Sequence, residues 1–255
     1  MKKTDELSLA KTLEFAAQCY TDKKTSVGID VFPFCKQVAR QAEKIAKRLY
    51  LDLKPEYISD SAQDTITAIV HCAILHDVLN QSTCAFENIA EITNVQIAAM
   101  VAAISRDFRL VETKRDMEFR GRLSQSPVGA QIVVVAHIIC TANTAINLLE
   151  TSGIKSLPKS KKMLAQMDGD LLAIRAADKY YVVRLYTQAA RNMLLTISQK
   201  IKSCKQQAKI EKMVLQNTKT LRESAEQAEK PETVKPRKKR EKRYATKRTP
   251  DNNSE

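Results

Sequence analysis

Apolar residues recur along most of the chain with the spacing of one helix face. In residues 34–51, Val38, Ala42, Ile45 and Leu49 stand three or four positions apart, and Lys and Arg fill many of the positions between them. A stripe with a period of 3.6 residues predicts an amphipathic helix. Related patterns predict helices over 5–20, 85–92, 94–105, 114–123 and 163–203, the last with a break at 168–170, and a solvent-facing helix over 204–229.

Two further segments are apolar on all sides, residues 68–79 and 132–140. The second is rich in Val and Ile, which favours a strand by propensity. Small and apolar residues continue to Leu149 without a turn signal, and this is too long for a strand. Because Ser126-Pro127 has the residue types of a helix start, we predict a buried helix after it.

Composition supports a helical protein. The 255 residues include five Gly, seven Pro and no Trp, so the turn residues that sheets need are scarce. We predict an all-α fold with three parts, which are a compact helical domain over 5–152, a helical extension over 159–229 and a tail over 230–255. The tail combines Pro with dense charge and few apolar residues, and this composition predicts disorder.

Nearly half of the net charge of +13 lies in that tail, which holds ten Lys or Arg against four Asp or Glu. A dense basic cluster attracts polyanions such as RNA. We therefore expect RNA or another polyanion as a partner, although a solubilising tail, a membrane contact or a protein contact would have the same composition. The predicted nucleic-acid-binding residues are Arg237, Lys238, Lys239, Arg240, Lys242 and Arg243.

The sequence also carries signals about the cellular setting. Its six Cys form no CxxC pair, and the first residues lack the apolar stretch of a signal peptide. No window contains the roughly 18 consecutive apolar residues of a membrane span. We therefore expect a cytoplasmic protein with unpaired thiols and no membrane span.

The buried segment 68–79 contains His76 and Asp77 side by side near its end. Two adjacent ionisable groups in an apolar helix need a partner, because burying an unpaired charge is costly. Imidazole and carboxylate are both ligands of divalent metals, so a metal ion is the expected partner. His71, one turn earlier, is expected to be a hydrogen-bonded core residue instead.

Several segments together resemble, in order and spacing, the HD-domain hydrolases of the RelA/SpoT type, which include hydrolases of guanosine tetraphosphate, (p)ppGpp. The resemblance covers about residues 10–150 and implies a compact all-α HD fold, a manganese site and a nucleotide ligand. It rests on Phe15-Ala16-Ala17, Lys23-Lys24, Gly28 with Val38-Ala39, the run from Ala73 to Leu79, and the run from Ser126 to Ala136.

Carried over to this sequence, the family's metal site is incomplete. The pair His76 and Asp77 is retained, but the first family His falls at Phe34, with Cys35 beside it as a less suitable ligand. The late family Asp falls at His137 or, in another register, at Asn143. The resemblance thus implies at most a reduced site of His76, Asp77 and His137 for manganese or another divalent ion.

The family's two catalytic carboxylates fall at Asn80 and Gln81. An amide orients a water molecule but cannot accept its proton at neutral pH. The family's basic substrate grip has Lys23 and Lys24 near its place, although a Lys pair in a loop is often only a solvated surface.

Two functions therefore stay open, and with them the question of whether the protein is an enzyme. The first is a degenerate HD domain with reduced or lost hydrolase activity and a binding or regulatory role. The alternative is an active metal-dependent phosphohydrolase that uses the reduced site of His76, Asp77 and His137 on a (p)ppGpp-like nucleotide.

Overall fold

The computed structural model describes residues 8–25, 28–50, 60–152 and 160–228. Within these ranges the regular structure is helical, apart from one isolated antiparallel bridge between Lys24 and Asp30, and the all-α prediction is confirmed. The helices are α1 (Leu9–Cys19), α2 (Val31–Tyr50), α3 (Asp60–Leu75), α4 (Val78–Gln81), α5 (Phe86–Ile92), α6 (Val95–Ala103), α7 (Glu112–Gln125), α8 (Val128–Ser152), α9 (Ser160–Leu172), α10 (Ala176–Lys179) and α11 (Tyr181–Ala228).

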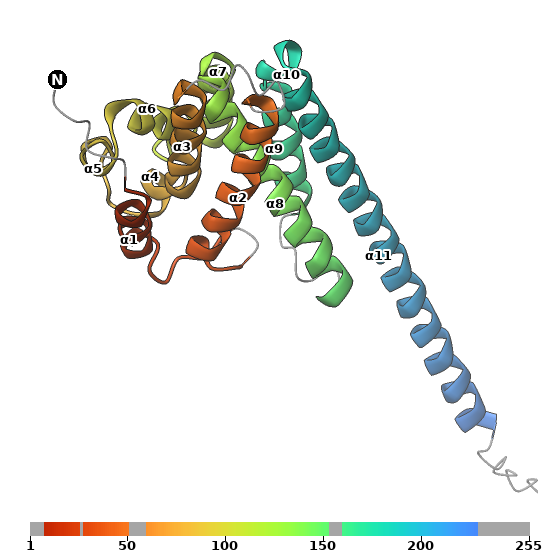
Figure 1. Ribbon diagram of the computed structural model, residues 1–255. Helices are drawn as coiled ribbons and strands as arrows, with labels where there is room; N and C mark the ends of the chain where they lie inside the picture. The colour runs from red at the N-terminus through yellow and green to blue at the C-terminus, as the bar shows by residue number, and fades with distance from the viewer. Residues whose placement is uncertain (1–7, 26–27, 51–59, 153–159, 229–255) are drawn as a thin grey trace, which may run out of the picture. The chain divides into compact units, whose positions relative to one another are not determined.

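Helices α2, α3 and α8 contact one another and form the centre of the main compact unit (Figure 1). The predicted stripe of α2 is buried, including Val38, Ile45 and Leu49. Gly129 of α8 lies against α3, where a Cβ atom would come within 2.8 Å of Ile69 Cγ1. This glycine therefore permits the close approach of α3 and α8.

The apolar segment predicted to follow Ser126-Pro127 is indeed a helix, α8, and most of its first half is buried. We expected no segment with the length and composition of a membrane span. This expectation is wrong, because α8 is long and apolar enough to cross a membrane by those two criteria. Two thirds of its most apolar window, 67%, is buried inside the protein, as in the core helix of a folded domain.

The expected break at 168–170 is absent, because α9 continues through Gly169 to Leu172 and the chain turns at 173–175 instead. A Cβ on Gly169 would lie 2.3 Å from Arg120 Nη2, so the missing side chain makes room for that guanidinium. Gly169 thus serves helix packing.

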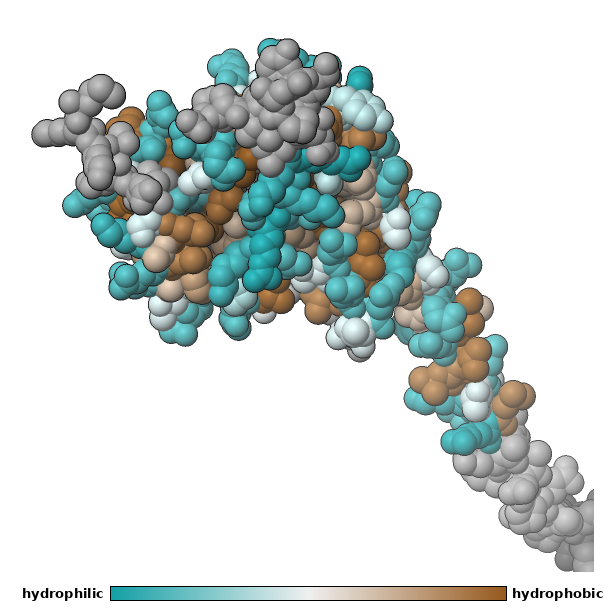
Figure 2. All heavy atoms as spheres, viewed as in Figure 1, coloured by the Kyte–Doolittle hydropathy of each residue, from teal (hydrophilic) through white to brown (hydrophobic). Residues whose placement is uncertain are grey.

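The main compact unit ends at Gln207, beyond the predicted boundary at 152, and a second unit begins at Ala208. Residues 205–223 of α11 are exposed, in agreement with the predicted solvent-facing helix. Figure 2 shows apolar and polar side chains interspersed on this part of the helix. Its exposed large apolar residues are Ile210, Met213, Val214, Leu215 and Leu221.

Candidate functional site

The pair His76 and Asp77 occupies the turn between α3 and α4. The last carbonyls of a helix and the first N–H groups of the next need outside partners. The buried Tyr20 hydroxyl supplies both, since it donates to Ile74 O at 3.1 Å and accepts from the Asp77 N–H at 3.3 Å. Tyr20, which the sequence did not single out, therefore fixes the turn that presents the pair.

His76 is bonded at both ring nitrogens. Its Nδ1 lies 2.7 Å from Ala73 O, and its Nε2 lies 2.9 Å from Nδ1 of His137. Because a carbonyl oxygen only accepts, Nδ1 of His76 carries a proton, and in the neutral ring Nε2 accepts from the Nδ1–H of His137. Three of the four ring nitrogens of His76 and His137 therefore take part in hydrogen bonds within the protein.

Both imidazoles are neutral near pH 7. Burial lowers the pKa of His76, opposing the influence of Asp77 beside it. Burial, together with the neighbouring His76 and then Arg106, lowers the pKa of His137 to about 3. Desolvation disfavours a charged imidazolium, so neither ring contributes a positive charge to the site at neutral pH.

The carboxylate of Asp77 is held by the amides of Asn80 and Gln81, the positions that the resemblance assigns to two acids. Asn80 Nδ2 donates to Oδ1 and Gln81 Nε2 donates to Oδ2, each at 2.9 Å. These residues lie three and four positions after Asp77, the spacing at which side chains on one helical turn meet. We call this arrangement the amide clamp.

The structure also places the other residues to which the resemblance pointed. Phe34 is buried and packs edge-on against His137, with ring centroids 5.4 Å apart. Burial raises the pKa of the Cys35 thiol, so it stays protonated. His137 contacts His76, whereas Asn143 is exposed.

A divalent ion does not fit these donors as they are arranged. Each Asp77 oxygen accepts one amide N–H group and keeps a second lone pair, but the only lone pair of His76 Nε2 accepts from His137. In the parts of the chain that the structure describes, His, Cys, Asp and Glu form no group of three that could hold a metal ion. His76, Asp77 and His137, the expected metal ligands, all line the same cavity. Of the four imidazole nitrogens, however, only Nε2 of His137 has a lone pair that is free for a metal ion.

These residues line a cavity of about 330 Å³, which we call the central cavity. Its opposite side contains residues that the sequence reasoning missed, including Arg106 and Phe108 after α6, Arg115 on α7, and Gln166 and Asp170 on α9. Enclosed pockets of roughly 300–1,000 Å³ are typical ligand sites. The central cavity is therefore the candidate functional site of the protein.

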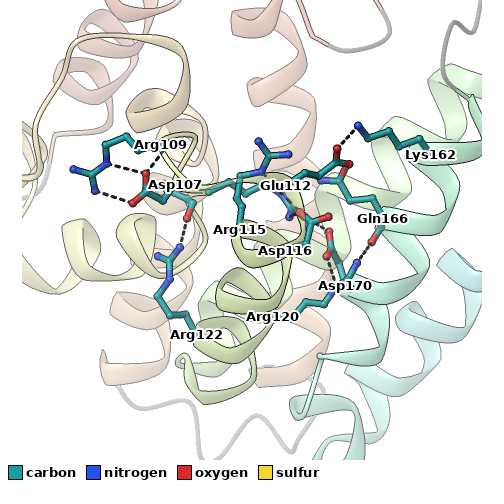
Figure 3. Close-up of polar contacts among 12 residues, drawn as sticks. Asp107, Arg109, Glu112, Arg115, Asp116, Arg120, Arg122, Lys162, Gln166 and Asp170 are labelled. Atoms are coloured by element: carbon teal, nitrogen blue, oxygen red, sulfur yellow. Dashed lines mark hydrogen bonds and ion pairs between the residues drawn. The ribbon is translucent and has the colours of Figure 1, made fainter.

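Paired ions form the wall built by α7 and α9 (Figure 3). Arg106 donates to Asp116 at 2.5 Å and also to Asp170. Asp170 accepts in addition from Arg120 Nε at 3.2 Å. With its amide oxygen turned toward Arg106, Gln166 accepts from Nε and Nη2 at 3.0 Å each. Arg106 thus has acceptors for four of its five N–H groups.

The remaining predicted residues lie elsewhere. Lys24 forms an exposed ion pair with Asp30 at 2.5 Å, and neither Lys23 nor Lys24 lines the central cavity. His71 is fully buried, and its Nδ1 is hydrogen-bonded to Thr12 at 2.8 Å, as expected of a core residue. The six tail residues predicted to bind nucleic acid lie outside the described ranges.

No family model matches the sequence, and the search of curated proteins finds none that is similar. A solved structure, described as a metazoan ortholog of SpoT that hydrolyses ppGpp, is similar in fold with a TM-score of 0.52. The match has 13% sequence identity and covers 71% of this chain and 92% of the other. At this identity the likeness concerns the fold, and the chain has the compact all-α HD fold to which its motifs pointed.

Proposed function

We propose that this protein is an HD-fold domain without phosphohydrolase activity, and that it acts by binding a small ligand in the central cavity. The observation that carries the proposal is the amide clamp on Asp77. The residues at the positions of the family's catalytic acids donate hydrogen bonds to the Asp77 carboxylate, so amide donors stand there in place of two further acids.

The chemistry of the remaining groups supports the same function. Hydrolysis of a phosphoanhydride needs a group that removes a proton from water, and neither Asn80 nor Gln81 accepts a proton at neutral pH. His76 and His137 are bonded to each other. Phe34 supplies no ligand atom at the position of the first family His. No side chain here therefore supplies the family's catalytic base or its first metal ligand.

The cavity itself is intact, which favours binding as the retained role. It is built by five helices, α2, α4, α7, α8 and α9, and by adjoining turns of the main unit, and its residues are held in place by hydrogen bonds and ion pairs. A pocket whose polar groups are fixed in advance loses little entropy when a ligand binds. The similar fold of a protein that hydrolyses ppGpp suggests a nucleotide as one candidate ligand.

The test is pyrophosphate release from guanosine tetraphosphate by the purified full-length protein with manganese ions. We expect no release above that of the matched variant Asp77→Ala, which removes the one acid of the site. Manganese-dependent release that Asp77→Ala abolishes would overturn the proposal. It would support instead the active phosphohydrolase with a reduced site of His76, Asp77 and His137.

A gain-of-function variant sharpens the result. The combined substitutions Phe34→His, Asn80→Glu, Gln81→Asp and His137→Asp place family residue types at the altered positions. We expect this variant to bind manganese more tightly than the wild type, because it adds carboxylate and imidazole ligands. Equal manganese binding by both proteins would show that the residues at these four positions do not account for weak manganese binding by the wild type.

A further inference from the structure

The central cavity carries little net charge. The charged side chains that line it are Asp77, Arg106, Arg115 and Asp170. Arg106 is paired with Asp170 and Asp116, and Asp77 is held by the amide clamp. Lys side chains are not among the lining residues. The cavity therefore lacks the excess of cations that a polyphosphate would need.

One cation in this cavity still has an unused donor. Arg115 is largely buried, with 17% of its side chain exposed, and its Nε–H has no acceptor within the described residues. The nearest carboxylate, that of Asp116, lies 3.9 Å from Nε and already accepts from Arg106 at 2.5 Å. A buried donor without an acceptor is costly and rare in folded proteins, so the guanidinium of Arg115 is not fully paired within the described residues.

Apolar side chains line the central cavity together with Arg115. Its guanidinium lies over the ring of Phe108, 4.8 Å from the centroid, and Phe108 is 61% exposed. The rest of the cavity wall includes Ile104, Phe119, Met163 and Met167. Methionine side chains adapt to the shape of a neighbour and make favourable contacts with aromatic rings. The cavity thus pairs one available cation with an aromatic and aliphatic surface.

We propose that the central cavity binds a small organic monoanion with an aromatic body, whose acid group is held by Arg115 and whose ring lies against Phe108 and the methionines of α9. This inference rests on the proposed function, because a phosphohydrolase of this family would need a polyphosphate in the same place. A polyphosphate is disfavoured, since each further negative charge would enter the cavity without a counter-charge.

Binding of two probes with the same ring system tests the proposal by calorimetry on the full-length protein. The probes are 2-naphthoate, a monoanion, and 2-naphthalenemethanol, which is uncharged. We expect one naphthoate per chain, and Arg115→Gln should weaken its binding roughly tenfold or more because a charge-assisted hydrogen bond is lost. The same substitution should change binding of the alcohol less than about threefold.

The matched control is Arg109→Gln, since Arg109 is exposed, carries the same charge and does not line the cavity. It should leave the affinity for naphthoate unchanged. Should Arg115→Gln fail to fold by circular dichroism, Phe108→Ala in the exposed loop replaces it, and this variant should weaken both probes. Unchanged naphthoate binding in these variants would overturn the proposal.

Guanosine tetraphosphate provides the decisive comparison. We expect it to bind more weakly than naphthoate. Tighter binding of guanosine tetraphosphate, or no binding of naphthoate at millimolar concentration, would refute the proposal that the cavity binds an aromatic monoanion. Neither result bears on hydrolysis, which pyrophosphate release measures separately, so failure of this inference is distinguishable from failure of the proposed function.

Discussion

The two walls of the central cavity satisfy their charged groups in different ways. On the wall of α3 and α4, Asp77 is held by neutral amides, and the histidines beside it are uncharged. On the wall of α7 and α9, carboxylates are paired with arginines. One wall of the cavity therefore surrounds its acid with neutral donors, whereas the other wall pairs its acids with cations.

The largest expected effect is on the ion-paired wall. Arg106→Met removes the cation shared by Asp116 and Asp170, whose side chains are 17% and 8% exposed. Breaking a buried pair leaves uncompensated charge, so we expect the free energy of unfolding to fall by about 3–5 kcal/mol. Urea denaturation followed by far-UV circular dichroism measures it. As a control, Arg109→Met should have no measurable effect because the Arg109 side chain is 90% exposed. An equal decrease in the free energy of unfolding in both variants would show that the ion pairs of Arg106 stabilise the fold no more than an exposed arginine does.

The next effect concerns the amide clamp. Gln81→Glu replaces the donor that lies 2.9 Å from Asp77 Oδ2 with a second carboxylate. We expect a loss of about 2–3 kcal/mol at pH 7, because a hydrogen bond to a charged group is lost and like charges are brought together. Gln81→Ala, which removes the donor without adding charge, should lose less. A variant Gln81→Glu as stable as the wild type without added metal would contradict the clamp.

The histidine pair predicts a dependence of stability on pH. The folded pKa of His137 is lowered to about 3 from an ordinary value of 6.5, so below pH 6.5 the unfolded chain binds a proton that the folded chain does not. Stability should therefore decrease as the pH falls from about 6.5 toward 3, by at most about 1.4 kcal/mol per pH unit for this group. In urea denaturation between pH 7 and 5, His137→Gln should show a shallower slope than the wild type; parallel slopes would exclude a buried neutral His137.

The smallest effect concerns the contact between α9 and α7. Gly169→Ala places a methyl group where Arg120 Nη2 lies 2.3 Å away, so the guanidinium must move and its bond to Asp170 weakens. In Gly121→Ala the added Cβ meets nothing within 4 Å. Since both substitutions raise helix propensity, we expect Gly169→Ala to be less stable than Gly121→Ala by about 1 kcal/mol in thermal unfolding. Equal stability would show that Arg120 contributes little there.

The sequence predicted what is encoded locally. The period of α2 and the length of the apolar run in α8 gave helices that the structure contains. His76, Asp77, Asn80 and Gln81 were found because they lie within six consecutive positions on adjoining turns. The amides also suggested the loss of catalytic acids, although their hydrogen bonds to Asp77 required the structure.

The sequence could not predict what depends on long-range packing. Arg106, Arg115 and Asp170 come from separate segments and meet only when α9 packs on α7. The choice between His137 and Asn143 was also open, since both stand on α8. At roughly 3.6 residues per turn, positions six apart point to different sides of a helix, and only His137 faces the cavity.

The central claim is that the site around Asp77, with its amide clamp and its hydrogen-bonded histidine pair, does not hold a metal ion. The most direct measurement is electron paramagnetic resonance of manganese titrated into the full-length protein, in which free and bound ions give different signals. We predict that at stoichiometric manganese the wild type gives the same free-ion signal as Asp77→Ala. Loss of the free-ion signal in the wild type, with its recovery in Asp77→Ala, would contradict the claim.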